Sequence, residues 1–121
     1  MKTRQEIGAV FEEAAAQSYK NSGYIIAQRN YRCRYGEIDL IAESKDEVVF
    51  AEVKVRKQSV GYTPSMAVDA KKVRRIKLTA LDYLRKSRQL NNTKYRYDIV
   101  EVTIIDENIN EISINVIKNA F

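Results

Sequence analysis

The sequence contains no histidine and a single cysteine, and these two shortages exclude several classes of enzyme chemistry. Without imidazole there is no histidine base, nucleophile or metal ligand. One thiol, Cys33, cannot form a disulfide within the chain, a zinc cluster or a thioredoxin-like pair, and we interpret it as a packing residue. Neither a GxxxxGK nor a GxGxxG phosphate loop is present. Carboxylate, lysine, hydroxyl and metal chemistry remain.

Long hydrophobic runs are also missing from the sequence. No stretch approaches 18 consecutive apolar residues, and the first residues lead into an amphipathic pattern instead of a secretory signal. We therefore expect a cytoplasmic protein that does not associate with a membrane. The 121 residues fit a single domain spanning 1–121. A net charge of +5 permits an anionic partner without proving one.

Hydrophobic periodicity predicts two helices and five strands. In the first helix the apolar face comprises Ile7, Val10, Phe11, Ala14, Ala15 and Ser18, with Glu12 at its edge. The predicted order is αβββαββ, an α/β protein with a mixed α+β sheet. In chain order the elements are a helix at 3–21, strands at 24–33, 36–42 and 50–56, a helix at 65–88, and strands at 95–105 and 109–117.

Charged residues interrupt the second and third of these strands. If residues 44–47 form a symmetric hairpin loop, the numbers of directly opposed residues add to 91. That register places Asp39 opposite Glu52 and Glu37 opposite Lys54 on one face. Opposed side chains have Cβ atoms about 4.5 to 5.5 Å apart, where like charges are destabilising. The Asp39 and Glu52 pair therefore needs an explanation.

Two explanations for these acids compete with a structural alternative. A shared proton would raise one carboxyl pKa, or a divalent cation such as Mg²⁺ or Mn²⁺ would bridge the two side chains. The lysine two residues along the same strand face favours the metal, because its ammonium could stabilise charge on a phosphate. The alternative is a network of surface salt bridges on a solvated sheet face.

The predicted second helix is strongly basic on one surface. Its cations could hold a nucleic-acid backbone through contacts that depend on salt and little on sequence, and a solvated helix face is the alternative. Three tyrosines, Tyr31, Tyr35 and Tyr62, could stack on unpaired bases, although they could equally be half-buried packing residues. The helix cations are Lys71, Lys72, Arg74, Arg75, Lys77, Arg85, Lys86 and Arg88.

The string GEIDLIA at 36–42, followed by FAEVKVR at 50–56, resembles the signature of the YraN-type uncharacterised proteins. That family is grouped with Holliday-junction resolvases in the PD-(D/E)XK, or restriction-endonuclease-like, nuclease superfamily. The element order αβββαββ is similar to that of the resolvases. The resemblance therefore implies a restriction-endonuclease-like core.

The resemblance also implies roles for individual residues. Asp39 and Glu52 would bind the metal, with the backbone carbonyl of Val53 as a further ligand. Lys54 would be the motif lysine, and Glu12 the acid that reaches the same site from the first helix. The residues expected to contact the nucleic acid are Lys71, Lys72, Arg75, Arg56 and Arg34.

The implied activity is Mg²⁺- or Mn²⁺-dependent hydrolysis of phosphodiester bonds in DNA, including branched or otherwise structured DNA. Resolvases of this kind work as symmetric dimers, so a homodimer is a further expectation. Two other interpretations stay open. One is a nucleic-acid-binding module that keeps the nuclease fold without cutting, and the other is a small α/β interaction protein whose acids form ordinary salt bridges.

Overall fold

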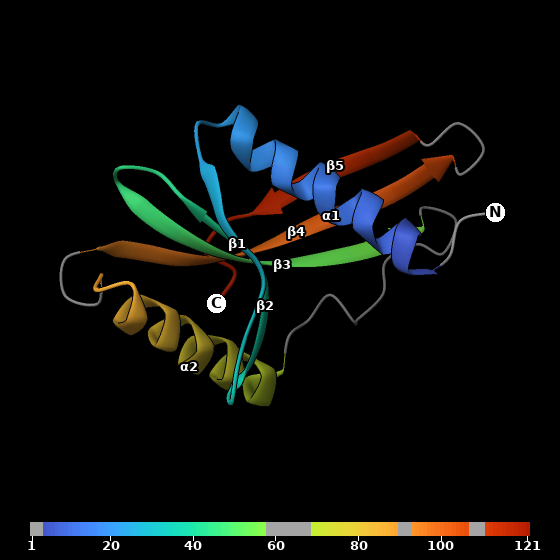
Figure 1. Cartoon of the computed structure of the whole chain (residues 1–121). Helices are drawn as coiled ribbons and strands as arrows, with labels where there is room; N and C mark the ends of the chain where they lie inside the picture. The colour runs from blue at the N-terminus through green and yellow to red at the C-terminus, as the bar shows by residue number, and fades with distance from the viewer. Residues whose placement is uncertain (1–3, 58–68, 90–92, 107–110) are drawn as a thin grey trace.

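The computed structural model describes residues 4–57, 69–89, 93–106 and 111–121, with side chains from residue 8 onward. Two helices and five strands follow one another in the predicted order αβββαββ, so the predicted fold class is confirmed (Figure 1). The predicted positions 65–68 of the second helix lie outside the described residues, and Asp69 caps that helix instead of belonging to it. The elements are α1 (Arg4–Asn21), β1 (Ile25–Cys33), β2 (Gly36–Glu43), β3 (Glu47–Lys57), α2 (Ala70–Lys86), β4 (Lys94–Asp106) and β5 (Glu111–Ile117).

The strands form one mixed sheet in the order β1-β2-β3-β4-β5. Neighbouring strands are antiparallel except for β3 and β4, which run parallel. A parallel pair needs a crossover connection, and α2 provides it by crossing the sheet between β3 and β4. The described helices include none that is long and apolar enough to span a membrane.

Each face of the sheet is covered by one helix (Figure 1). On one face, Ala15, Ala16 and Tyr19 of α1 pack against strand residues that include Leu40 and Val100. On the other face, α2 packs on a cluster made of Ile38, Ile41, Val48, Phe50, Ile76, Ala80, Tyr83, Leu84 and Tyr97. A side chain that lies between the sheet and either helix is therefore surrounded by packed core residues of both elements.

The buried face of α1 is rotated relative to the predicted one. Val10, predicted to face the core, is 42% exposed, whereas Ala16 and Tyr19 are buried. The Tyr19 hydroxyl donates a 2.8 Å hydrogen bond to the buried carboxylate of Asp98, and this polar anchor fixes the rotation of the helix. As a result Glu12, one turn before Ala16, lies half-buried toward the sheet instead of at the edge of the apolar face.

The predicted hairpin register is correct for the part of the hairpin that forms a ladder. Four pairs join β2 to β3, from Glu43↔Val48 to Leu40↔Ala51, and each adds to 91. The ladder stops there, so the predicted pairs Asp39 with Glu52 and Glu37 with Lys54 are not directly opposed residues of this ladder. The two strands separate at the residues that carry the charges.

The alternation of β2 is also broken at this point. Ile38 and Ile41 pack in the same cluster on the α2 side, although strict alternation would put them on opposite faces. The β1–β2 ladder passes from Arg29↔Leu40 to Tyr31↔Ile38, and Asn30, which lies between, has a φ of 51°. This left-handed residue of β1 faces the point where the alternation of β2 breaks, and the register is the same on both sides of it. The irregularity frees Asp39 from the ordinary pleat.

A buried polar network joins α1, β3 and β4. Asp98 is fully buried and accepts hydrogen bonds from Tyr19, from the backbone N–H of Asn119 and from Arg96, whose Nε lies 2.9 Å from Oδ1. Arg96 also forms an ion pair with Glu47. These contacts make Asp98 a structural residue that pairs with the neighbouring Arg96.

We expect Asp98→Ala to lower the free energy of unfolding by about 3 kcal/mol or more, because it leaves the poorly exposed Arg96 guanidinium without a buried partner. Asp98→Asn, which keeps the shape and loses the charge, should lie between this variant and the wild type. Urea denaturation followed by circular dichroism measures both. Asp46→Ala, in the exposed β2–β3 loop, is the control, and an equal effect there would contradict the role of the network.

Candidate functional site

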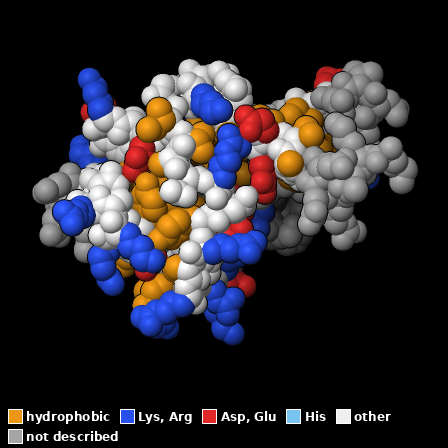
Figure 2. Space-filling model, viewed as in Figure 1, with side chains coloured by type: hydrophobic (Ala, Val, Ile, Leu, Met, Phe, Trp, Pro, Cys, Tyr) orange, Lys and Arg blue, Asp and Glu red, His pale blue; other side chains and the backbone are white. Residues whose placement is uncertain are grey.

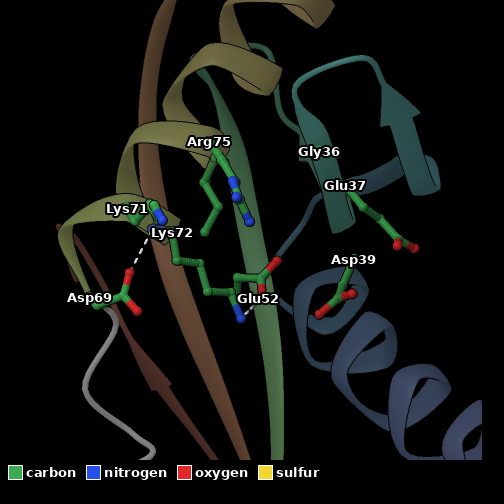
Figure 3. A pocket seen from close by; sticks show the side chains of 9 residues that line it. Gly36, Glu37, Asp39, Glu52, Asp69, Lys71, Lys72 and Arg75 are labelled. Carbon is green, nitrogen blue, oxygen red and sulfur yellow. Dashed lines mark hydrogen bonds and ion pairs between the residues drawn. The ribbon is translucent and has the colours of Figure 1, made fainter.

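An open pocket of about 500 Å³ lies where β2 and β3 separate beside the first turns of α2 (Figure 3). It brings together both predicted metal-binding acids and three of the predicted nucleic-acid-binding cations. Its lining residues are Gly36, Glu37, Asp39, Glu52, Asp69, Lys71, Lys72, Arg75 and Ile76. Residues up to 40 positions apart in the sequence, from Gly36 to Ile76, therefore meet in one place.

Asp39 is held at the gap between the strands by a backbone hydrogen bond. Its Oδ2 atom accepts a 2.8 Å hydrogen bond from the N–H of Val53. The Asp39 side chain therefore satisfies an N–H that would pair with the β2 backbone in a continuous ladder. Burial raises the pKa of Asp39, this hydrogen bond opposes the rise, and the charge of Glu37 adds to it. Asp39 is thus a fixed carboxylate in a site that disfavours its charge.

Glu52 is 7% exposed, an unusually deep position for a glutamate. Its pKa is raised first by burial and next by the charge of Asp39. The two acids are therefore electrostatically coupled, as the predicted juxtaposition requires. The Nζ atom of Lys72, from the first turns of α2, lies 3.3 Å from Glu52 Oε2 and partly offsets this charge (Figure 3).

Lys54 lies two residues beyond Glu52 on β3 and is half-buried. Burial lowers its pKa, and contact with Lys72 lowers it further, while Glu52 and Asp39 act in the opposite direction. The charge of the predicted lysine therefore interacts with both acids, although its side chain does not line the pocket. Glu37, predicted to lie opposite Lys54, forms an ion pair with Arg32, whose Nε atom lies 3.4 Å from Glu37 Oε2.

Glu12 approaches the same site from α1. Burial raises its pKa first, the charge of Asp39 raises it next, and a hydrogen bond with Asn30 opposes the rise. In Figure 3, α1 passes beside Asp39. The structure thus places the predicted helix acid near Asp39, on the opposite side of the sheet from α2. Asn30, which sequence analysis missed, orients Glu12 from its left-handed position in β1.

The donors present match a hard divalent cation in kind. Mg²⁺ is usually bound through one or two carboxylates, with water and substrate phosphate as the other ligands. Asp39 and Glu52 supply two such carboxylates, and the main chain of Val53 lies beside them. Among the described residues no group of three acids or cysteines is close enough to hold a metal ion, so Glu12 is not in the same ligand set in this conformation.

The predicted cations divide into three positions. Lys71, Lys72 and Arg75 line the pocket that contains Asp39 and Glu52, which we call the acidic pocket. Arg34 lines a second pocket, which shares Arg75 with the acidic pocket. Arg56 lies farther along β3, where its Nε atom donates a 3.4 Å hydrogen bond to Thr103, and it lines neither pocket. Figure 2 shows lysine and arginine side chains gathered over the α2 side of the molecule.

Comparisons with known proteins agree with the resemblance found in the sequence. The model of "Uncharacterised protein family UPF0102" matches residues 11–102. A UPF0102 protein of Clostridium botulinum is 44% identical over 117 residues, covering 97% of this chain and 94% of its own. A UPF0102 protein of Caldicellulosiruptor saccharolyticus is 41% identical over 119 residues, covering 98% of each chain. With the family model covering most of the chain and relatives matching nearly all of it, this protein belongs to the uncharacterised protein family UPF0102.

Proposed function

We propose that this protein is a metal-dependent nuclease that hydrolyses phosphodiester bonds in DNA. The observation that carries the proposal is that Asp39 and Glu52 line one pocket beside the basic start of α2, with Lys54 two residues beyond Glu52 on β3. Two coupled carboxylates, of which Glu52 is buried and Asp39 half-buried, reduce the stability of the folded protein, and a bound cation would relieve their repulsion. The adjacent lysines and arginine suit a phosphate that approaches such a cation.

The residues in and around the pocket have separate roles in this proposal. Asp39 and Glu52 would hold one Mg²⁺ or Mn²⁺, which supplies polarisation of the phosphate and a lower pKa for an attacking water. Lys54 offsets the negative charge that develops on the phosphate oxygens. Lys71 and Arg75 hold the flanking backbone, which makes binding salt-dependent. Val53 fixes Asp39 through its N–H, and Glu12 adds negative charge from the side of α1.

A second candidate function is a nucleic-acid-binding module that does not cut. The ion pair between Lys72 and Glu52 favours it, because the ammonium neutralises one of the two acids without a metal. In that case the basic α2 surface would bind nucleic acid and the acids would serve only to order α2 against β3. Both candidates predict binding, and only the first predicts cleavage.

We expect cleavage of labelled DNA in Mg²⁺ or Mn²⁺, and a loss on the order of 100-fold or more in Asp39→Asn, Glu52→Gln and Lys54→Ala. The substrates are duplex, single-stranded, flap and four-way-junction DNA, with RNA for comparison. Gel electrophoresis measures the products, and sizing of the protein with and without the junction tests for a homodimer.

Asp46→Asn removes an acid from the exposed β2–β3 loop and is the matched control. Cleavage that persists in Glu52→Gln would indicate a contaminating nuclease or a different site and would refute the proposal. Binding to every substrate with no cleavage in either metal would leave the binding module as the function.

The raised pKa of Glu52 also makes a prediction about stability. Between the unfolded-state pKa, near 4.5, and the raised folded pKa, the folded protein keeps the Glu52 proton while the unfolded chain loses it, so stability falls as the pH rises across this range. Glu52→Gln removes this cost. We therefore expect the variant to be more stable than the wild type at pH 7, with a difference that disappears as the pH falls to about 4.5.

Urea denaturation at several pH values measures this difference, and Glu111→Gln, at an exposed position of β5, is the control. A Glu52→Gln variant that is less stable than the wild type at pH 7 would show that the ion pair with Lys72 outweighs the burial of the carboxylate.

A further inference from the structure

A second pocket of about 520 Å³ adjoins the acidic one and is formed by the β1–β2 turn and α2. It shares Gly36, Glu37 and Arg75 with the acidic pocket, so the two are continuous. The lining residues of this turn pocket are Arg32, Cys33, Arg34, Tyr35, Gly36, Glu37 and Arg75. The function proposed for the acidic pocket involves no residue at the tip of the β1–β2 turn.

The turn pocket has the opposite charge to its neighbour. Three arginines face a single acid, Glu37, which is engaged by Arg32 at 3.4 Å. The remaining guanidiniums, those of Arg34 and Arg75, are exposed and belong to none of the salt bridges found between described residues. An anion that extends from the acidic pocket therefore meets two cations here.

The turn also presents an aromatic ring. The guanidinium carbon of Arg34 lies 4.8 Å from the centroid of the Tyr35 ring, and the Arg34 Nη2 atom donates a 2.6 Å hydrogen bond to the Tyr35 hydroxyl. The contact orders two planar groups on which a base can stack. Tyr31 on the same hairpin is not equivalent, because its hydroxyl donates to Asp82 and its ring packs edge-on against Tyr83.

Close packing fixes the turn against α2. Gly36 has a φ of 154°, and a Cβ atom there would lie 3.4 Å from Thr79 Oγ1 and 3.7 Å from Arg75 Cβ. The backbone of the turn thus lies about one methyl group away from the helix that supplies the cations. At the other side of the turn, the Tyr35 N–H donates to the sulfur of Cys33 at 3.4 Å. The arginines and the ring are consequently held beside the acidic pocket at a fixed position.

We propose that the turn pocket binds the nucleotide next to the one held at the acidic pocket, with its phosphate on Arg34 and Arg75 and its base stacked at Tyr35. Because a ring can stack on a base only when that base has left the duplex, the substrate class is DNA with an unpaired strand at the site. This inference rests on the proposed function for the path of the strand. It concerns binding, so it can be tested without cleavage.

The test is fluorescence anisotropy of a labelled oligothymidylate in EDTA, compared with an abasic strand of the same length and with a duplex. We expect Tyr35→Ala to weaken binding of the oligothymidylate by roughly fivefold or more and to leave the abasic strand and the duplex almost unchanged. Tyr35→Phe keeps the ring and should bind the oligothymidylate like the wild type. Arg34→Ala should weaken both single strands and flatten the salt dependence of binding.

Lys45→Ala is the matched control, because it removes one exposed positive charge from the opposite end of the β2 strand. Circular dichroism and thermal melting show that each variant is folded. Equal losses for the intact and abasic strands in Tyr35→Ala, or no loss for either, would overturn the proposal. A Tyr35-dependent preference for the intact strand supports the turn pocket even when no DNA is cleaved, whereas cleavage without that preference supports the nuclease alone.

Discussion

The hydrogen bond from the Val53 N–H to the Asp39 carboxylate is the contact on which the site depends. In an uninterrupted hairpin the Val53 N–H would face the neighbouring strand, and the space between β2 and β3 would be closed. Here a side chain accepts that hydrogen bond, and the ladder ends at Leu40↔Ala51. The separated strands leave room for Glu52 to face a pocket while it remains 7% exposed. The Asp39 carboxylate thus takes the place of a backbone carbonyl as the acceptor for Val53. This exchange accompanies the opening between the strands and fixes Asp39, one of the two acids that line it.

The two helices act on this opening from opposite faces of the sheet. From one face α1 brings Glu12, whose charge repels Asp39, and from the other α2 brings Lys72, which attracts Glu52. Burial opposes the charge of all three acids, so the site lowers the stability of the folded protein. The surrounding core must compensate for that loss. The Asp98 network supplies part of it, because it fixes α1 to β4 through Tyr19 and Arg96. A rigid scaffold and an electrostatically unfavourable site are therefore built by the same two helices.

The sequence was sufficient for the element order and for the register of the β2–β3 hairpin, because hydrophobic alternation and loop position determine both. It was also sufficient to predict that Asp39 and Glu52 lie close together. It did not predict the end of the ladder, since a side chain that replaces a backbone acceptor leaves no periodic signal. Hydrophobic periodicity alone put Glu12 at the edge of the apolar face, because the hydrogen bond from Tyr19 to Asp98, 79 residues away, sets the rotation of α1; the family resemblance gave the position of Glu12 correctly. The pairing of Lys72 with Glu52 depends on where the crossover helix begins, which Asp69 determines by capping it.

The arrangement of the two pockets argues for an extended polyanion over a small ligand. The acidic pocket alone would suit a cation, and the turn pocket alone would suit any small anion. They are continuous through Gly36, Glu37 and Arg75, and the sign of the charge changes from one to the other. A nucleic-acid strand has phosphates at regular intervals, so it can place one beside a cation on Asp39 and Glu52 and the next on Arg34. In the proposed binding mode the base between them would lie at Tyr35, so the same geometry would link the proposed chemistry of the acids to the recognition of an unpaired strand.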